Sequence, residues 1–245
     1  MNLSMKQNMA LGSVAVFGLA LSQAQEIPDR PEKLTFPPLI YDAPNPADYR
    51  VELESGVIVY IYPDRARPLI DLSVNVRGGS YLDPKGKEGL AGLTGYLMAR
   101  GGIPSKPADE LDEELEFLAA RLSSSFGGLK GSVSLNLLSK DADRGFEILR
   151  AVLAAPNFQQ DKLTLRKTQL LQGLKQRNDD SRNIESRERK LLAYGDGFWG
   201  NRHTTAASLE GIRREDLLAF HHDWVHPRNF IVSISGDFDL SLIHI

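Results

Sequence analysis

The chain has 245 residues, of which 42% are hydrophobic and 25% are charged, and its formal net charge is −3. These values are typical of one or two soluble globular domains, and nothing in them indicates a nucleic-acid or membrane-surface partner, which would need a concentrated basic surface. Cysteine is absent, which excludes disulfides and thiolate metal sites.

Residues 1–24 have the pattern of a secretory signal peptide. Lys6 precedes an apolar run over residues 10–21, and Ser22-Gln23-Ala24 places small residues at the −3 and −1 positions of a cleavage site. The run is shorter than the ~20 apolar residues of a membrane span, and an uncleaved anchor or a buried helix is the alternative. Cleavage after Ala24 predicts an exported protein, periplasmic or extracellular, without membrane contact after cleavage.

Residues 25–48 are expected to form an extended leader. Six prolines lie between Pro28 and Pro46 with no periodic pattern around them. Proline fixes φ and removes a backbone donor, so such a segment does not form a packed element. A folded domain is expected over residues 49–239.

Runs rich in β-branched and alternating apolar residues predict the strands. The first two runs are separated by Glu54-Ser55-Gly56 and indicate a hairpin, and a later pair is expected to turn at Gly127-Gly128. Strands are expected over residues 49–53, 57–62, 69–76, 123–125, 132–138 and 229–235. Those up to residue 76 are expected to pair antiparallel with residues 132–138 and 229–235.

Apolar residues at helical spacing predict the helices. In the first one, Leu90, Leu93 and Leu97 are expected to face the sheet, and Ser139 is expected to cap the third. Residues 160–192 form either one long helix or two helices joined near residues 179–180. Helices are expected over residues 89–100, 108–122, 140–155, 160–192 and 213–224. Hairpin strands with helices grouped between them predict an α+β domain with a mostly antiparallel sheet.

Residues 240–245 are interpreted as a tail that is not native. The hexapeptide Leu-Ser-Leu-Ile-His-Ile is encoded by CTG TCT CTT ATA CAC ATC, which is a transposase end used in preparing sequencing libraries. We expect a truncated chain whose native sequence ends near Asp239. A natural tail that matches by coincidence is the alternative.

Residues 79–91, Gly-Ser-Tyr-Leu-Asp-Pro-Lys-Gly-Lys-Glu-Gly-Leu-Ala, resemble the segment that leads into the inverted zinc motif HxxEH of insulinase-like (pitrilysin family) peptidases. Asn157-Phe158 before the long helical segment, and residues 209–237, are similar to further parts of that family. The resemblance covers about residues 49–239. It implies the insulinase/mitochondrial processing peptidase fold.

The resemblance also implies that the zinc site is lost. In HxxEH two histidines at i and i+4 bind zinc and the glutamate acts as general base. The aligned positions here are Gly92, Gly95 and Tyr96, and the third zinc ligand, a glutamate on a later helix, corresponds to Gly173. Glycine has no side chain and a phenol is a poor zinc ligand, so neither a catalytic residue nor a zinc cofactor is expected.

Two other groups of residues are candidate sites. His222 and His226 stand at i and i+4, which is a metal-ligand spacing, but Pro227 follows directly and two histidines near a helix C-terminus are the alternative. Ser123, Ser124 and Ser125 lie on the strand that, in the resembling family, pairs with an extended peptide. An edge that serves only packing is the alternative there.

The resemblance implies a non-catalytic subunit, or half, of an exported metallopeptidase assembly that acts on peptides. Its partner would be a catalytic insulinase-family homologue or a second half of the same protein. A peptide-binding or assembly scaffold without a peptidase partner is the alternative. An active metallopeptidase with a displaced metal site is a third hypothesis.

Overall fold

The computed structural model describes residues 30–34, 36, 38, 40 and 43–239. The chain divides into two units, Met1–Ala43 and Pro44–Ile245. The described part of the first unit contains one 3-10 turn, Pro31–Lys33. The expected signal peptide, the tail over residues 240–245 and part of the proline-rich leader lie outside the described residues.

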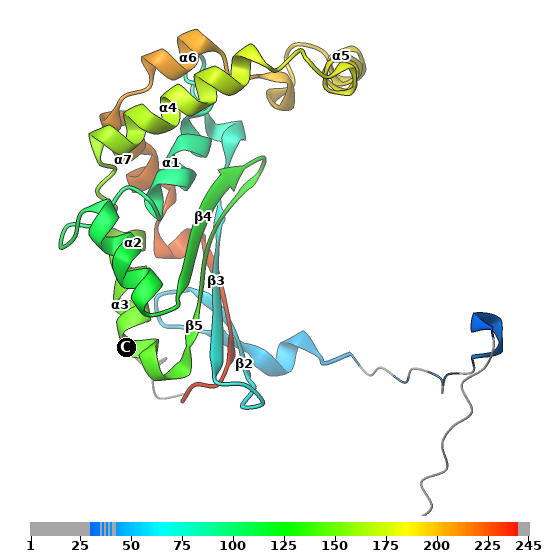
Figure 1. Ribbon diagram of the computed structural model, residues 1–245, viewed down its shortest axis with the longest axis vertical. Helices are drawn as coiled ribbons and strands as arrows, with labels where there is room; N and C mark the ends of the chain where they lie inside the picture. The colour runs from blue at the N-terminus through cyan, green and yellow to red at the C-terminus, as the bar shows by residue number, and fades with distance from the viewer. Residues whose placement is uncertain (1–29, 35, 37, 39, 41–42, 240–245) are drawn as a thin grey trace, which may run out of the picture. The chain divides into compact units, whose positions relative to one another are not determined.

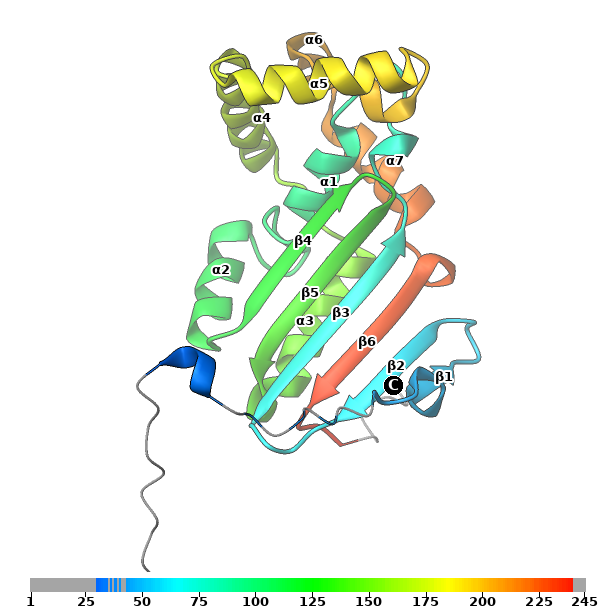
Figure 2. The same cartoon turned by 90° about the vertical axis from the view of Figure 1, so that its right-hand side faces the viewer.

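A six-stranded sheet forms the centre of the second unit (Figures 1 and 2). Its spatial order is β1-β2-β6-β3-β5-β4, and neighbouring strands are antiparallel except β2 and β6. The prediction of a mostly antiparallel sheet is therefore confirmed. The strands are β1 (Arg50–Glu52), β2 (Ile58–Pro63), β3 (Leu69–Arg77), β4 (Arg121–Gly127), β5 (Lys130–Leu138) and β6 (Phe230–Gly236).

Strand β6 lies between two strands that are consecutive in the sequence. β2 and β3 run in opposite directions, and a strand placed between them must be parallel to one of the two. Val232 of β6 pairs with Val74 in the antiparallel ladder and with Val59 in the parallel one. The antiparallel pairing predicted for residues 229–235 is right for β3 and wrong for β2.

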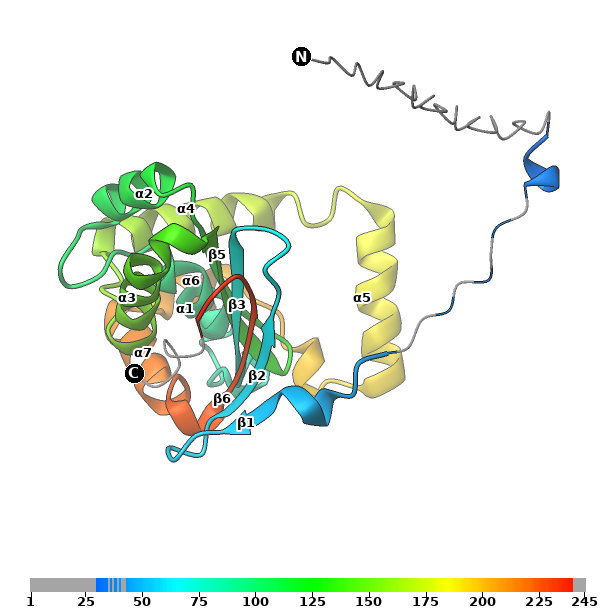
Figure 3. The same cartoon turned by 90° about the horizontal axis from the view of Figure 1, so that it is seen from below.

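Helices α1, α2, α3 and α7 lie on one face of this sheet, and the described residues place no helix over the opposite face (Figures 1 and 2). Helix α5 lies beyond one end of the sheet (Figures 1 and 2) and is displaced to the side away from α1, α2 and α3 (Figure 3). None of the described helices is long and apolar enough to cross a membrane. The helices are α1 (Leu90–Met98), α2 (Ala108–Phe117), α3 (Ala142–Ala154), α4 (Gln160–Lys175), α5 (Ser181–Tyr194), α6 (Ala206–Gly211) and α7 (Arg214–Trp224).

Residues 160–192 form two helices, as one of the two predicted alternatives had it. Helix α4 ends at Lys175, and α5 begins after Asp180, whose carboxylate accepts a hydrogen bond from the Arg182 backbone N–H at 2.9 Å. An acidic N-cap satisfies a backbone donor that a helix start leaves free. Asp179 and Asp180 therefore lie where one helix ends and the next begins, and not in the middle of one long helix.

Three local predictions are wrong. Helix α2 ends at Phe117 and not at Leu122, because Ala119 has a φ of 50° and the chain enters β4 at Arg121. The turn of the later hairpin is Gly128-Leu129, since Gly127 pairs with Lys130. The Ser139 hydroxyl caps no helix: α3 begins at Ala142 after a 3-10 turn, and this hydroxyl is buried without a partner.

The two faces of the sheet differ in chemistry. Leu90, Leu93 and Leu97 of α1 are buried, as expected, in the core on the helix-covered side. On the opposite face, one row across four strands consists of serines. They are paired in register as Ser123, Ser134, Ser73 and Ser233. Small hydroxyl side chains make that face flat and polar.

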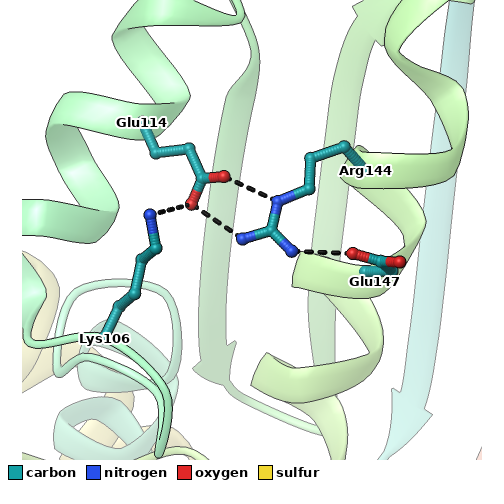
Figure 4. A network of polar contacts seen from close by, with 4 residues as sticks. All are labelled: Lys106, Glu114, Arg144 and Glu147. Atoms are coloured by element: carbon teal, nitrogen blue, oxygen red, sulfur yellow. Dashed lines mark hydrogen bonds and ion pairs between the residues drawn. The ribbon is translucent and has the colours of Figure 1, made fainter.

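An ion-pair network joins α2 to α3 (Figure 4). The Glu114 carboxylate accepts hydrogen bonds from the Arg144 guanidinium at 2.6 and 3.0 Å and pairs with the Lys106 ammonium at 2.9 Å. Arg144 also reaches Glu147 at 2.7 Å. The hydrogen bonds from Arg144, followed by those from Lys106, lower the pKa of Glu114 to about 2 although partial burial opposes this.

Candidate functional site

Helix α1 carries the candidate site, and the loop before it fixes where the helix starts. The Asp83 carboxylate is 5% exposed and accepts hydrogen bonds from the backbone N–H groups of Gly89, at 2.8 Å, and Ala91, at 2.7 Å. Gly89 has a φ of +105°, a conformation that favours glycine. Burial raises the pKa of Asp83, although these two hydrogen bonds oppose the effect. The segment that resembles the family thus works here as the N-terminal cap of α1.

Gly95 brings α1 into direct contact with the backbone of β4. A Cβ atom on Gly95 would lie 2.2 Å from the backbone nitrogen of Phe126 and 2.6 Å from the carbonyl carbon of Ser125. Real Cβ atoms do not approach other atoms so closely, and backbone atoms cannot move aside as a flexible side chain can. A glutamate side chain has no room at this position.

The Ser124 hydroxyl ties the same helix to the same strand. It donates a hydrogen bond to the Gly95 carbonyl at 2.5 Å and accepts one from the Ala99 backbone N–H at 2.9 Å. Ser124 is buried, whereas Ser123 and Ser125 are exposed on the polar face of the sheet. The three serines of the candidate edge strand therefore do not share one role.

β4 is an edge strand of the sheet, and its ladder with β5 shows which part of the edge is open. A pair that closes a two-residue loop is hydrogen-bonded, and bonded and non-bonded pairs alternate along an antiparallel ladder. The backbone groups of Leu122, Ser124 and Phe126 therefore point away from β5. The backbone nitrogen of Phe126 lies against α1 at Gly95, so the end of β4 is in contact with that helix.

The other side of α1 faces α4. Gly92 lines a cavity of 190 Å³ with Leu170 and Leu174 of α4, and Tyr96 lines a neighbouring one of 140 Å³. The guanidinium of Arg166 lies in both cavity walls and stacks on the Tyr96 ring, 3.9 Å from its centre. This geometry is that of a cation–π contact.

Gly173 takes no part in this arrangement. It is exposed, and a Cβ atom there would have no neighbour within 4 Å. The residues of α4 that face α1 are Arg166, Leu170 and Leu174. Leucines at positions 163, 170 and 174 lie on one helical face, and this spacing could have identified the face from the sequence.

The residues around Gly92 and Tyr96 do not fit a zinc ion. Gly92 and Gly95 offer no ligand atom, and the guanidinium groups of Arg166 and Arg100 lie 3.9 and 4.7 Å from the centre of the Tyr96 ring. Fixed positive charges oppose the binding of another cation. The arrangement is that of a packed helix–helix contact.

His222 and His226 do not converge on a shared point with a third ligand. The His222 side chain is 88% exposed, and its Nδ1 atom pairs with the adjacent Asp223 at 3.0 Å. Among the described residues, no group of three or more histidine, aspartate or glutamate side chains is placed to hold a metal ion.

Comparison with known proteins identifies the fold. No protein-family model matches the sequence, and no curated protein matches it. Among solved structures, the inactive domain of an M16 peptidase from Pseudomonas fluorescens is similar with a TM-score of 0.72, 23% identity, and coverage of 79% of this chain and 47% of that chain. A protease from Helicobacter pylori is similar with a TM-score of 0.68, 18% identity and coverage of 80% and 47%.

The first half of the periplasmic protease PqqL from Escherichia coli is similar too, with a TM-score of 0.68, 15% identity, and coverage of 80% of this chain and 43% of that chain. This chain therefore spans less than half the length of these solved structures. Identities below 25% establish the fold alone. The chain has the fold of insulinase-like, or pitrilysin-like, peptidase domains.

Proposed function

We propose that this chain is a non-catalytic half of an exported two-part metallopeptidase assembly that acts on peptides. In such an assembly the partner, a catalytic homologue or a second half, supplies the zinc site. This domain supplies one wall of the chamber that holds the peptide.

The observation that carries the proposal is the contact between Gly95 and Phe126. The position that corresponds to the general base of HxxEH lies against the backbone of β4, where a side chain cannot fit. Gly92 and Tyr96 face α4, and Arg166 occupies the space between them. These contacts stabilise a domain that does no metal chemistry.

The open face of the sheet supports a role as a chamber wall. Its serine row is flat and polar, and the described residues leave it without a covering helix. The fold neighbours named as an inactive domain and as the first half of a protease are consistent with the division into two parts. Peptide contact at the beginning of β4 would add to this surface.

Metal content and peptidase activity test the proposal. After dialysis, the purified chain should contain less than stoichiometric zinc, and a chelator should leave its melting temperature unchanged. The double variant Gly92→His, Tyr96→His should not gain stoichiometric zinc, because the position of the third ligand is Gly173 and the Arg166 guanidinium lies beside residue 96. Stoichiometric zinc in the unaltered chain, or a melting temperature that falls with chelator, would favour the displaced site at His222 and His226.

The partner distinguishes a peptidase half from a scaffold. Peptide cleavage should require a homologue that carries HxxEH from the same genome, and should depend on that homologue's glutamate. Co-purification of the two proteins with peptide cleavage supports the proposal. If the chain binds labelled peptides without such a partner and never supports cleavage, it is a peptide-binding scaffold.

A further inference from the structure

The two cavities between α1 and α4 differ in chemistry. The cavity of 190 Å³ opens beside Gly92 and is lined mainly by leucine side chains. The cavity of 140 Å³ is lined by the Tyr96 ring and by charged side chains. Arg166 belongs to both walls, so the two cavities adjoin one another. An apolar compartment beside a polar one suits a ligand group that has both characters.

The polar cavity carries positive charge that the chain itself does not neutralise. The charged side chains in its wall are Arg100, Asp112, Lys162 and Arg166. Lys162 forms an ion pair with Asp109. No carboxylate in the described part of the chain forms an ion pair with Arg100 or Arg166. The charges that oppose a zinc ion here therefore favour an anionic group.

The two guanidinium groups are positioned by an aromatic ring and keep free donors. They lie 4.7 Å (Arg100) and 3.9 Å (Arg166) from the centre of the Tyr96 ring. Arg166 donates one hydrogen bond, to the Gln169 side chain at 3.1 Å. A guanidinium has five N–H donors in a planar fork that matches the geometry of a carboxylate. The cavity beside them has the volume of about five water molecules, which is enough for a carboxylate and the carbon atom that bears it.

The apolar cavity has room for a side chain next to that carboxylate. Gly92 is exposed in its wall, and a Cβ atom there would have no neighbour within 4 Å. Leu93 and Leu209 form the buried part of the wall, whereas Leu170 and Leu174 are only partly buried. An apolar group placed against these leucines removes their exposed surface from water, which stabilises the complex.

We propose that the two cavities together bind the C-terminal residue of a peptide that ends in an apolar side chain. Arg100 and Arg166 bind the terminal carboxylate, and the last side chain lies in the apolar cavity beside Gly92. At a peptide C-terminus the carboxylate and the side chain share one carbon atom, as two adjoining cavities require. The inference rests on the part of the proposed function in which this domain contacts peptides, and it is independent of the partner and of zinc.

Binding of labelled peptides to the purified chain alone tests the proposal. A short peptide that is labelled at its N-terminus and ends in leucine with a free carboxylate is measured by fluorescence anisotropy. The comparison peptides are its C-terminal amide, an amide with an internal glutamate, and a free acid that ends in glycine. The free acid that ends in leucine should bind about tenfold more tightly than each of the other three.

Two variants with matched controls separate the two cavities. Arg100→Gln should abolish the preference for the free acid over the amide, whereas Arg150→Gln, at an exposed arginine of α3, should leave it unchanged. Gly92→Leu should abolish the preference for leucine over glycine and keep that for the free acid. Gly173→Leu, at an exposed glycine of α4 with equally open surroundings, should keep both preferences. Unchanged melting temperatures of the four variants show that the fold is intact.

Equal affinities for the free acid and its amide, or equal losses in Arg100→Gln and Arg150→Gln, would overturn the proposal. So would an amide that binds as tightly through its internal glutamate, because the site would then bind acidic side chains. Absence of binding to every peptide would overturn it as well. In each case, cleavage that requires a catalytic homologue would still support the proposed function, so the two failures are distinguishable.

Discussion

At the scale of single residues, Gly92 and Gly95 lie three positions apart on α1 but have opposite surroundings. A Cβ atom on Gly92 meets nothing within 4 Å, whereas one on Gly95 meets the backbone of Phe126 at 2.2 Å. We expect Gly92→Ala to raise the free energy of unfolding by about 0.5–1 kcal/mol, because alanine is the better helix former. Gly95→Ala should lower it by about 1–3 kcal/mol through overpacking.

Urea denaturation of the two variants against the parent chain measures both effects. The two substitutions add the same atom to the same helix, so each is the control for the other. Equal effects of the two would show that α1 does not lie against β4 as described.

Ser124 and Ser125 form a second matched pair. The Ser124 hydroxyl bridges Gly95 and Ala99, and its loss leaves buried backbone groups without a partner. Ser124→Ala should therefore lower the free energy of unfolding by about 1–3 kcal/mol. Ser125 is exposed, and Ser125→Ala should change it by less than about 0.5 kcal/mol. Thermal unfolding followed by circular dichroism checks both, and a similar loss in both variants would contradict the assigned bridge.

At the scale of elements, Glu114 links α2 to α3 in a way that depends on pH. Its pKa is lowered to about 2 in the folded chain, so its contribution to stability is complete above the unfolded pKa and is lost as pH falls through the folded one. The difference in unfolding free energy between the parent and Glu114→Gln should be constant above about pH 5 and should shrink from there toward pH 2. Urea denaturation at a series of pH values measures it.

Glu147 provides the control for this network. Its side chain is 66% exposed and accepts a hydrogen bond from the Nη1 atom of Arg144. Exposed ion pairs contribute little, so Glu147→Gln should follow the parent chain within about 0.5 kcal/mol at every pH. If the difference in unfolding free energy between the parent and Glu114→Gln stayed constant down to pH 2, the Glu114 carboxylate would not be paired with Arg144.

Most elements could be predicted from the sequence because their signals are local. The hairpin before residue 63, β3, α1 and α7 follow from apolar periodicity and glycine positions within a few residues. The parallel pairing of β2 with β6 could not be predicted in this way. It depends on contacts between residues almost the length of the domain apart, and no local pattern reports them.

The residues at the motif positions could be predicted from the sequence, but the contacts that they make could not. The glycines at 92 and 95 are visible in the sequence, but only the structure shows that one is open and the other is closed by Phe126. The resemblance aligns Gly173 with the third zinc ligand, although the face of α4 that meets α1 carries Arg166 and Leu170. Side chains alternate between the two faces of a strand, and this alternation distinguishes the buried Ser124 from Ser123 and Ser125.

At the scale of the whole molecule, β6 holds the sheet together. Without it, β1 and β2 have no hydrogen-bonded connection to the other three strands. A chain that ends at His226 should therefore lose cooperative unfolding, with the amide protons of β2 exchanging at rates near those of an unfolded chain. A chain that ends at Asp239 is the control. Protection of β2 in the shorter chain would show that another contact fixes it.

The position of β6 also sets the order in which the domain can form during synthesis. A ribosome delivers β2 some 170 residues before β6, at a rate of roughly 5–20 residues per second. Throughout that interval the amino-terminal hairpin has no partner strand to dock on, and pairings between distant segments form slowly. The β1–β2 hairpin therefore joins the sheet only after β6 has been made, whereas β3, β5 and β4 can pair with one another as soon as residue 138 has been added.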